Sequence, residues 1–309
     1  MHLWHAAASM SSPTSPPLRS AAAFAVAAVV DDRGPPPGQY SFGAGAAILL
    51  VLCGAALAAW LCALSGMTGP GPALLLSLLC LATVPIGNFW QRSGIFGRVL
   101  IAGPTDSPPR IALTFDDGPD PVSTPQVLAA LAQHGVRATF FVIGDRAARH
   151  PQLLSEMAQA GHQIENHSLH HAWMTAFVPP QRLQRELAQV QALIESHTGR
   201  RPRWFRPPIG ILSPRIAQAA AALGLRLAGW SHKARDGWSS TQLPDAIARL
   251  RRGLRPGSIL LLHDAREATG HPDKPGPPTL AVPLLQALLP ELKARGLHAV
   301  PLDELLQAP

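Results

Sequence analysis

The 309-residue sequence is short of cysteine and of aromatic residues. Its three cysteines, Cys53, Cys62 and Cys80, all lie in apolar segments, and the rest of the chain has none. A functional site outside those segments therefore uses no thiolate, and no disulfide is needed in either redox compartment. The chain has one tyrosine, 6% aromatic residues and no known nucleic-acid-binding motif. These shortages argue against a partner that is bound by base stacking.

Charge is absent from two long stretches near the N-terminus. Residues 42–65 carry no charged side chain and are long enough to cross a bilayer, and residues 71–87 are also uncharged but shorter. The five residues 66–70 between them leave room only for a tight turn. We expect two transmembrane helices within residues 41–88. A buried pair of core helices is the alternative interpretation.

The segments on either side of this hairpin differ in composition. Residues 1–40 are rich in Ser, Pro and Gly and are expected to be disordered, and the Ala-rich run 21–30 is too short to span. Residues 89–104 are expected to form a linker to a domain at 105–305. The arrangement predicts a protein of a bacterial-type inner (cell) membrane.

The flanking charges leave open which side of the membrane the domain faces. Two arginines precede the hairpin and two follow it, which favours cytoplasmic flanks on both sides: Arg19, Arg33, Arg92 and Arg98. Asp31 and Asp32 weaken that tendency.

The most informative motif is TFDDGP at residues 114–119, where the apolar run 111–115 ends in two acids and a Gly-Pro turn. The pattern predicts a buried strand that delivers Asp116 and Asp117 to a loop. Side chains alternate along an extended segment, so the two carboxylates can act separately, as a metal ligand and as a general base. A solvated Asp-Gly turn is the simpler interpretation of this motif alone.

A second motif, NHSLHH at residues 166–171, favours a metal site. His167 and His171 stand four residues apart, which brings two imidazoles to one ion on a helix or in a tight loop. Two histidines and one aspartate make a three-ligand site with open positions, the form typical of a catalytic metal. A surface or capping role explains a single histidine better than it explains this pair, and His170 has the wrong offset to join it.

Seven short apolar runs predict strands, and helical patterns separate most of them. The expected strands are 111–115, 138–143, 162–166, 203–206, 225–230, 258–262 and 297–301. Helices are expected to begin at Thr124-Pro125, Pro179-Pro180 and Ser213-Pro214, because Pro is favoured at the first helical position. Residues 181–196 carry apolar side chains at helical spacing. Alternating strands and helices predict an α/β parallel sheet or barrel with the motifs at the C-terminal ends of its strands.

Three more motifs follow in order, namely RWFRPPIG, GWSHKARDGW and SILLLHD. They contain Arg206, Trp230, Asp236, Trp238 and His263. Together with TFDDGP and HSLHH, they resemble the five ordered motifs of the NodB-homology polysaccharide deacetylases, carbohydrate esterase family four. The resemblance covers about residues 105–305. It implies an α/β fold, a distorted (β/α) barrel of about seven strands, preceded here by the transmembrane helical hairpin.

The resemblance implies a role for each matching position. Asp116 would be the general base, Arg206 would orient it, and His263, in the pattern begun by Leu261, would be the general acid. The implied ligands of a divalent metal are Asp117, His167 and His171, with zinc the usual ion and cobalt, manganese or nickel as alternatives. The implied reaction is hydrolysis of an N-acetyl group on an amino sugar.

The same motifs imply a substrate groove, and they depart from the family pattern in two places. The groove would be lined by Pro207, Pro208, Ile209, Trp230, Trp238 and Leu261. Ile209 stands where the family commonly has an aromatic residue. Lys233 occupies the first acid position of the fourth motif, where Asp236 fits the second. Because every metal and acid-base position is intact, we interpret these departures as altered substrate choice rather than lost catalysis.

The chain is basic, with a formal charge of +7, and from residue 104 onward it has 22 Lys and Arg against 17 Asp and Glu. Two arginine clusters stand out, one at positions 200, 201, 203 and 206 and one at positions 249, 251, 252 and 255. They form either a solvated basic face or a surface that attracts anionic lipid headgroups or a phosphate-bearing substrate.

The sequence therefore predicts a membrane-anchored, metal-dependent hydrolase that removes N-acetyl groups from amino-sugar glycans. The first alternative is a deacylase or deformylase of a lipid-linked amino sugar. The second is a non-catalytic carbohydrate-binding or scaffolding membrane protein. Nothing in the sequence implies a protein partner or a nucleic acid. The Pro- and Gly-rich loop 265–278 is expected to rim the site.

Overall fold

The computed structural model describes residues 44–104, 109–266 and 278–307. The predicted disordered segment 1–40, with its Ala-rich run, lies outside the described residues. Most of the predicted rim loop, residues 267–277, lies outside them as well.

The uncharged segments form two helices, α1 (Ala44–Leu64) and α2 (Gly71–Phe89), joined by a short turn. They pack against each other, and the Trp60 indole donates a hydrogen bond to the Ser77 hydroxyl at 3.1 Å. Many large apolar side chains on both helices are exposed, including Leu61 at 59% and Leu78 at 62%. Among the described residues, α2 alone is long and apolar enough to cross a membrane, and Leu49–Leu64 is a shorter apolar helix.

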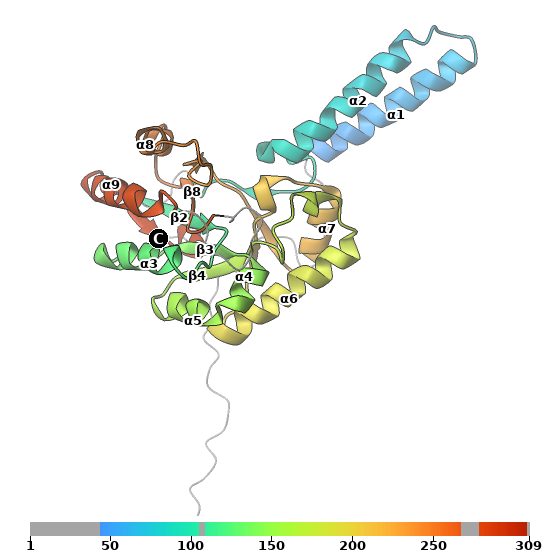
Figure 1. The fold of residues 1–309 in the computed structure, drawn as a ribbon. Coiled ribbons are helices and arrows are strands. Elements are labelled where there is room, and N and C mark those ends of the chain that lie inside the picture. Colours follow the sequence, from blue (N-terminus) through green and yellow to red (C-terminus); the bar gives the residue numbers. More distant parts are fainter. Residues whose placement is uncertain (1–43, 105–108, 267–277, 308–309) are drawn as a thin grey trace, which may run out of the picture. The chain divides into compact units, whose positions relative to one another are not determined.

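The rest of the described chain folds into one curved sheet with helices outside it (Figure 1). The strands are β1 (Val99–Leu100), β2 (Arg110–Asp116), β3 (Thr139–Val142), β4 (Gln163–Asn166), β5 (Trp204–Phe205), β6 (Arg226–Ala228), β7 (His232–Lys233), β8 (Ile259–His263) and β9 (His298–Val300). The helices are α3 (Ser123–Gln133), α4 (Gly144–Arg149), α5 (Pro151–Gln159), α6 (Pro180–Thr198), α7 (Pro214–Ala222), α8 (Leu243–Arg251), α9 (Ala281–Ala294) and α10 (Leu302–Leu305). Three 3₁₀ turns, η1 (Gln91–Ser93), η2 (Trp173–Phe177) and η3 (Pro208–Gly210), complete the described elements.

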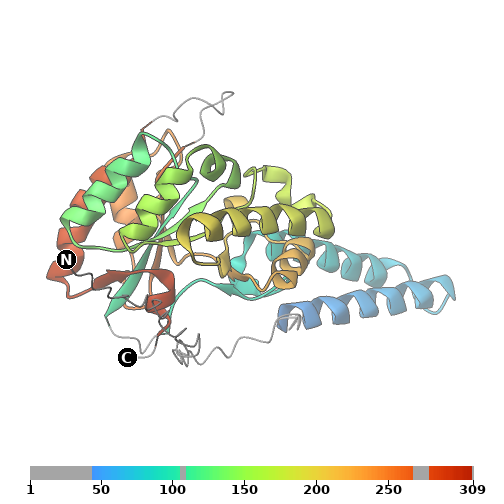
Figure 2. The same cartoon turned by 90° about the horizontal axis from the view of Figure 1, so that it is seen from below.

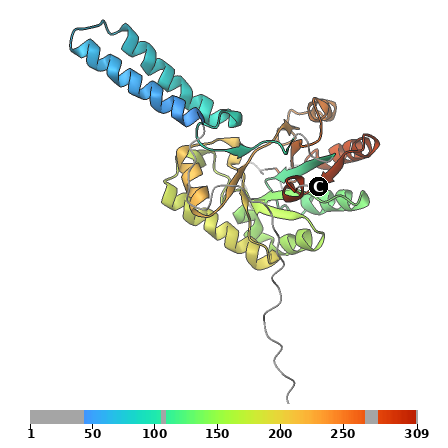
Figure 3. The same cartoon turned by 180° about the vertical axis from the view of Figure 1, so that it is seen from behind.

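The strands pair in the order β1-β6-β5-β4-β3-β2-β8-β7, and every pairing of these strands is parallel. Strand β9 pairs with the first half of β2. Helices α6, α5, α3, α9 and α8 contact one another in that succession, which Figures 2 and 3 show from two further directions. The parallel α/β barrel expected from the sequence is confirmed, but the barrel is open. Strands β1 and β7 are the two edges of the sheet and do not pair with each other.

Alternation along the strands decides where the core and the site lie. In β2, Ile111, Leu113 and Phe115 point outward into the main apolar core beneath the helices. The residues between them face inward, and Asp116 is the last of these. Strand β8 follows the same pattern, with Leu260 and Leu262 in the outer core. The inner face therefore becomes polar at the C-terminal ends of the strands.

All seven predicted strands are present, with bounds that differ by a few residues. The prediction missed β1 and β7, because two residues are too few to show a periodic pattern. Helix α7 begins as predicted, and the Ser213 side chain accepts a hydrogen bond from the Ile216 amide. Helix α6 also begins as predicted, at Pro180, with Pro179 before it.

The predicted start of α3 at Thr124-Pro125 is one residue late. Helix α3 begins at Ser123, and the Asp120 carboxylate accepts hydrogen bonds from the amides of Val122 and Ser123. The Thr124 hydroxyl is inside the helix and donates to Asp264 instead of acting as the cap. The Asp120 carboxylate thus satisfies amides at the beginning of α3, and the Thr124 hydroxyl also accepts from the Asp120 amide at 2.8 Å.

Candidate active site

The two acids of TFDDGP take different positions, as the alternation of a strand predicts. Asp116 ends β2 with its side chain inside the barrel and is 3% exposed. Asp117 follows with φ of 75°, a left-handed conformation that aspartate tolerates better than most residues. The Arg146 guanidinium donates to the Asp117 carbonyl oxygen at 2.9 Å and holds this turn. The turn aims the Asp117 carboxylate at the histidines that follow β4.

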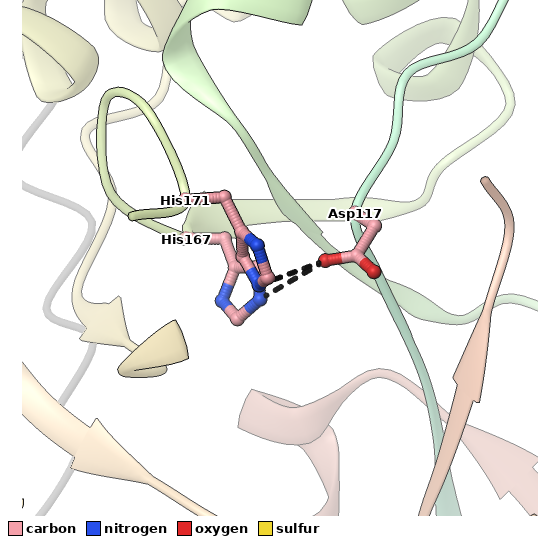
Figure 4. A group of neighbouring side chains, drawn as sticks. All are labelled: Asp117, His167 and His171. Carbon is pink, nitrogen blue, oxygen red and sulfur yellow. Dashed lines mark ion pairs between the residues drawn. The ribbon is translucent and has the colours of Figure 1, made fainter. Parts of the chain in front are cut away.

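Asp117, His167 and His171 form a compact cluster in which one ligand atom of each lies within 4.8 Å of the others (Figure 4). The Asp117 Oδ1 atom is 3.4 Å from His167 Nε2 and 3.3 Å from His171 Nε2. That Oδ1 atom is buried and has no hydrogen-bond partner among the described residues. The two imidazoles lower the pKa of Asp117 against the opposing effect of burial, so its carboxylate is ionised at neutral pH.

The two histidines lie in a tight loop after β4 rather than on a helix. His171 has φ of 52°, and its amide donates to the Ser168 hydroxyl at 3.1 Å. The His167 Nδ1 atom is 2.7 Å from the Arg206 carbonyl oxygen, so Nδ1 carries the proton and Nε2 is free to bind an ion. His170 points elsewhere and pairs with Asp145 at 2.7 Å on the surface.

Arg206 is fully buried and contacts Asp116 directly. Its guanidinium donates to Asp116 Oδ1 at 2.6 Å, to the Thr114 hydroxyl at 2.9 Å and to the Gly229 carbonyl oxygen at 2.8 Å. It also stacks 4.0 Å from the centroid of the Phe141 ring. Burial lowers the pKa of Arg206, and the charge of Asp116 opposes that effect. The pair fixes the Asp116 carboxylate, whose other oxygen lies 3.7 Å from His167 Nε2.

His263 ends β8 next to Asp116. The two residues are direct partners in the β2–β8 register, so their side chains enter the barrel side by side. Asp236 holds His263 through both carboxylate oxygens, one 2.8 Å from Nδ1 and one accepting from the His263 amide at 2.9 Å. Burial alone would lower the pKa of His263, but the charge and hydrogen bond of Asp236 outweigh it and raise that pKa to about 9.

The residues expected to line a groove lie around this edge in different environments. Ile209 is 60% exposed, and its φ of 61° is unusual for a β-branched residue. Trp238 is 66% exposed, and Trp230 packs under the turn at Gly210, where an added Cβ would come within 2.4 Å of its ring. Pro207, Pro208 and Leu261 are buried, and Leu261 is only 5% exposed. Their contact with substrate stays a prediction.

Two residues next to the site, Asp264 and Arg146, were given no role in the sequence analysis. Asp264 is fully buried beside the TFDDGP turn, where a Cβ on Gly118 would come within 2.1 Å of its carboxylate. Its Oδ2 atom accepts from Thr124 at 2.6 Å, and burial raises its pKa to about 7. Arg146, which fixes the Asp117 backbone, was also missed. The only signal for Asp264 is its place after His263 in SILLLHD, and Arg146 had none.

A family model described as polysaccharide deacetylase matches residues 103–228. The chain is 34% identical over 198 residues to a peptidoglycan-N-acetylglucosamine deacetylase of Bacillus cereus, covering 64% of this chain and 88% of that one. The chain belongs to the polysaccharide deacetylase family. Another member, a chitooligosaccharide deacetylase of Bradyrhizobium, is 34% identical over 201 residues, covering 63% of this chain and 90% of that one.

The fold of this polysaccharide deacetylase domain matches that of solved family members. A family 4 acetyl xylan esterase from Clostridium thermocellum, in complex with a cobalt ion, aligns with a TM-score of 0.55 and 35% identity. The alignment covers 63% of this chain and 89% of that one.

The donor set of this chain fits a divalent metal. Two imidazoles and a carboxylate are borderline and hard donors that suit zinc and similar ions. The Asp117 Oδ1 atom, buried without a hydrogen-bond partner among the described residues, faces both Nε2 atoms. A buried acceptor in this position costs stability unless a cation balances it. The three residues therefore form a candidate site for a divalent metal, and their geometry leaves the choice of metal open.

Proposed function

We propose that this protein removes N-acetyl groups from amino-sugar glycans by hydrolysis. The observation that carries the proposal is the pairing of Asp116 and His263 on adjacent strands beside the metal-ligand cluster. A carboxylate and an imidazole held side by side are the general base and general acid that amide hydrolysis requires. The relatives named for peptidoglycan and chitooligosaccharide deacetylation support an N-acetylated amino sugar as substrate.

The residues of this chain divide the proton transfers between them. Asp116 takes a proton from the attacking water, and Arg206 holds the carboxylate in place through one oxygen so that the other faces the cluster. His263, with its pKa raised to about 9 by Asp236, is protonated at neutral pH and donates to the leaving amine. The two groups thus begin the reaction in the protonation states that it needs.

Asp117, His167 and His171 would hold the metal, for which we propose zinc, with cobalt, manganese or nickel as substitutes. A divalent ion held there supplies a Lewis acid that polarises the acyl oxygen and activates water. The Arg206 carbonyl oxygen fixes the His167 ring for this task. We further propose that Ile209 and Trp238 contact the sugar chain, and their exposure supports this.

We also propose that α1 and α2 anchor the domain in the inner membrane of a bacterial cell. The exposed apolar side chains of both helices support this, because they would otherwise face water. Helix α2 has the required length and composition. Identifying the substrate will indicate the side of the membrane on which the domain lies. Activity on an extracellular glycan implies the outer side, and activity on a lipid-linked or nucleotide-linked sugar at the inner leaflet implies the inner side.

The first experiment measures acetate and formate release by the full chain in neutral detergent, loaded with zinc or cobalt. The substrates are chitooligosaccharides, peptidoglycan fragments and a lipid-linked amino sugar. Asp116→Asn is the inactive control, and Asp145→Asn, which alters an exposed aspartate that pairs with His170, is the matched control. We expect acetate release from a soluble glycan that Asp116→Asn abolishes and Asp145→Asn keeps.

Other outcomes would redirect the proposal. Release from the lipid-linked sugar alone would favour a deacylase or deformylase that works in the plane of the bilayer. If neither acetate nor formate is released from any substrate although one metal ion is bound per chain, a non-catalytic carbohydrate-binding membrane protein would be favoured.

A further inference from the structure

A hollow of about 520 Å³ lies beside the open seam of the barrel, where β7 ends the sheet. None of the acid-base or metal-site residues lines it. It is bounded by the segment after β1, by β7 and by the turn that follows α8. Six cationic side chains line this basic hollow: Arg92, Lys233, Arg235, Arg249, Arg252 and Arg255.

The cations of the basic hollow have no acidic partner within the described ranges. No aspartate or glutamate lines the hollow, and none of the six forms an ion pair with a described carboxylate. The Nη1 atom of Arg249 is buried without a hydrogen-bond partner among the described residues. A buried charged donor left unpaired is costly, so an anion that pairs with it would stabilise the hollow.

The charges lie close enough to affect one another. Burial lowers the pKa of Lys233, and the charge of Arg235 lowers it further. Burial also lowers the pKa of His232, which lines the hollow, and Arg255 and Arg92 act in the same direction. Both effects are expected where like charges converge in a partly desolvated space.

A solvated basic face accounts for only part of this arrangement, because five of the six cations are exposed whereas the Nη1 atom of Arg249 is buried. Arg251 belongs to the same sequence cluster, yet it points away and pairs with Glu291 at 2.6 Å. The C-terminus of α8 favours nearby cations through its dipole, which accounts for Arg249. It does not account for Arg92 and Lys233, which reach the hollow from η1 and β7. Separate segments therefore converge on one space.

We propose that the basic hollow binds a phosphate-bearing group. Guanidinium groups match phosphate oxygens in a bidentate geometry, and several of them around one hollow suit a phosphate ester or diphosphate. Ala, Gly, Ser and Pro make up most of the other lining, so the ligand is recognised by its charge rather than by a stacked ring. The volume suits a small phosphorylated group. The proposal does not rest on the deacetylase activity.

Two sources could supply the phosphate. Arg92 stands three residues after Phe89, the last residue of α2, which is long and apolar enough to cross a bilayer. A residue at that position is within reach of phospholipid headgroups when α2 spans the membrane. A soluble phosphate compound would use the same cations.

The test titrates the full chain in neutral detergent by calorimetry. One arm uses inorganic pyrophosphate, and the other uses short-chain phosphatidylglycerol with short-chain phosphatidylcholine as the zwitterionic control. The double variant Arg249→Gln/Arg252→Gln removes two charges from the hollow, and Arg251→Gln removes one from the same helix outside it. Thermal melting checks that each variant is folded. Arg255→Gln, at an exposed position, serves as a second probe of the hollow.

We expect binding that the double variant weakens about tenfold or more and that Arg251→Gln changes less than about threefold. Binding in both arms, with competition, identifies the phosphate group itself as the ligand. Binding of phosphatidylglycerol alone identifies a lipid headgroup, and binding of pyrophosphate alone identifies a soluble phosphate. Absence of saturable binding in both arms, or equal weakening by Arg251→Gln and by the hollow variants, overturns the proposal.

Discussion

The candidate active site and the basic hollow both gather charged side chains on one barrel, but they balance charge differently. In the candidate active site, Arg206 faces the Asp116 carboxylate and His263 faces that of Asp236. In the hollow, cations face one another, without an acidic partner among the described residues. Internal pairing fixes orientation and protonation before any ligand arrives. Unpaired positive charges instead create a positive potential that favours the binding of an anionic ligand.

Two histidines, the partly buried His263 and the buried His162, show the same contrast on the scale of single residues. His263 has Asp236 beside its ring, and its pKa rises to about 9. His162 forms no ion pair with a carboxylate in the described part of the chain, and its Nδ1 atom accepts from the Ala138 amide at 3.1 Å. Burial, followed by the charge of Arg137, lowers the pKa of His162 to about 4. The partner, and not burial alone, decides the direction of the shift.

The largest effect is expected from Asp116→Asn, which removes the proposed base and keeps the shape of the side chain. Turnover should fall by about 10³-fold or more, because general-base catalysis is lost. Metal content should stay at the wild-type level, since Asp116 is outside the proposed ligand set. Steady-state kinetics and metal analysis check both parts. Substantial remaining turnover would remove Asp116 as the base.

His167→Ala should weaken metal binding by more than about 100-fold, because it removes one of the three proposed ligands. His170→Ala is the matched control, since it removes a histidine from the same loop that pairs with Asp145 on the surface. Competition with a zinc chelator measures the affinity of both variants. A His167→Ala protein with wild-type affinity would place the metal on other residues.

Asp236→Asn tests whether internal pairing sets the protonation of His263. The variant keeps a hydrogen-bonding side chain but loses the charge that raises the pKa of His263. The alkaline limb of the kcat/KM profile should move to lower pH by about one unit or more, and the rate at neutral pH should fall by about tenfold. Asp245→Asn, at an exposed position on α8, is the control. An unshifted limb contradicts the role of Asp236.

His162→Asn should leave turnover near the wild-type rate and change only the acid stability. Asn can still accept from the Ala138 amide but does not titrate. In the wild type, the folded-state pKa of about 4 lies below the ordinary value of 6.5, so the unfolded chain takes up a proton in between. Stability therefore falls as the pH drops from 6.5 to 4, by about 2 kcal/mol more than in the variant. Urea unfolding at pH 7 and pH 4 measures this, and equal losses in both proteins would contradict it.

The sequence predicted the parts of the site that are local in the chain. TFDDGP and the histidine pair each place their residues within a few positions, so the strand alternation and the His spacing sufficed for Asp116, Asp117 and His171. Contacts between distant segments were out of reach. The bond from His167 to the Arg206 carbonyl oxygen spans 39 positions and involves a backbone atom, which leaves no trace in residue type.

The basic hollow could not be predicted from the sequence either. The sequence shows the arginine cluster at positions 249–255, but not which of its members point to the same space. The structure turns Arg249 into the hollow and Arg251 toward Glu291. Lys233 was interpreted as a departure from the fourth motif that alters substrate choice, and its place in the lining of the hollow could not be predicted. Periodicity could not show this, because β7 has only two residues and the turn after α8 has no repeat.

Arg206 makes two contacts in the candidate site, one through its side chain and one through its backbone. A substitution removes only the side-chain contact. Its side chain holds Asp116, and any substitution at this position breaks that bond. Its backbone carbonyl oxygen holds His167, and every residue type supplies the same atom. A substitution at position 206 therefore leaves the contact that orients His167, a proposed metal ligand, but changes the contact that orients Asp116, the proposed base. In a lineage under relaxed selection, we expect metal binding to outlast turnover.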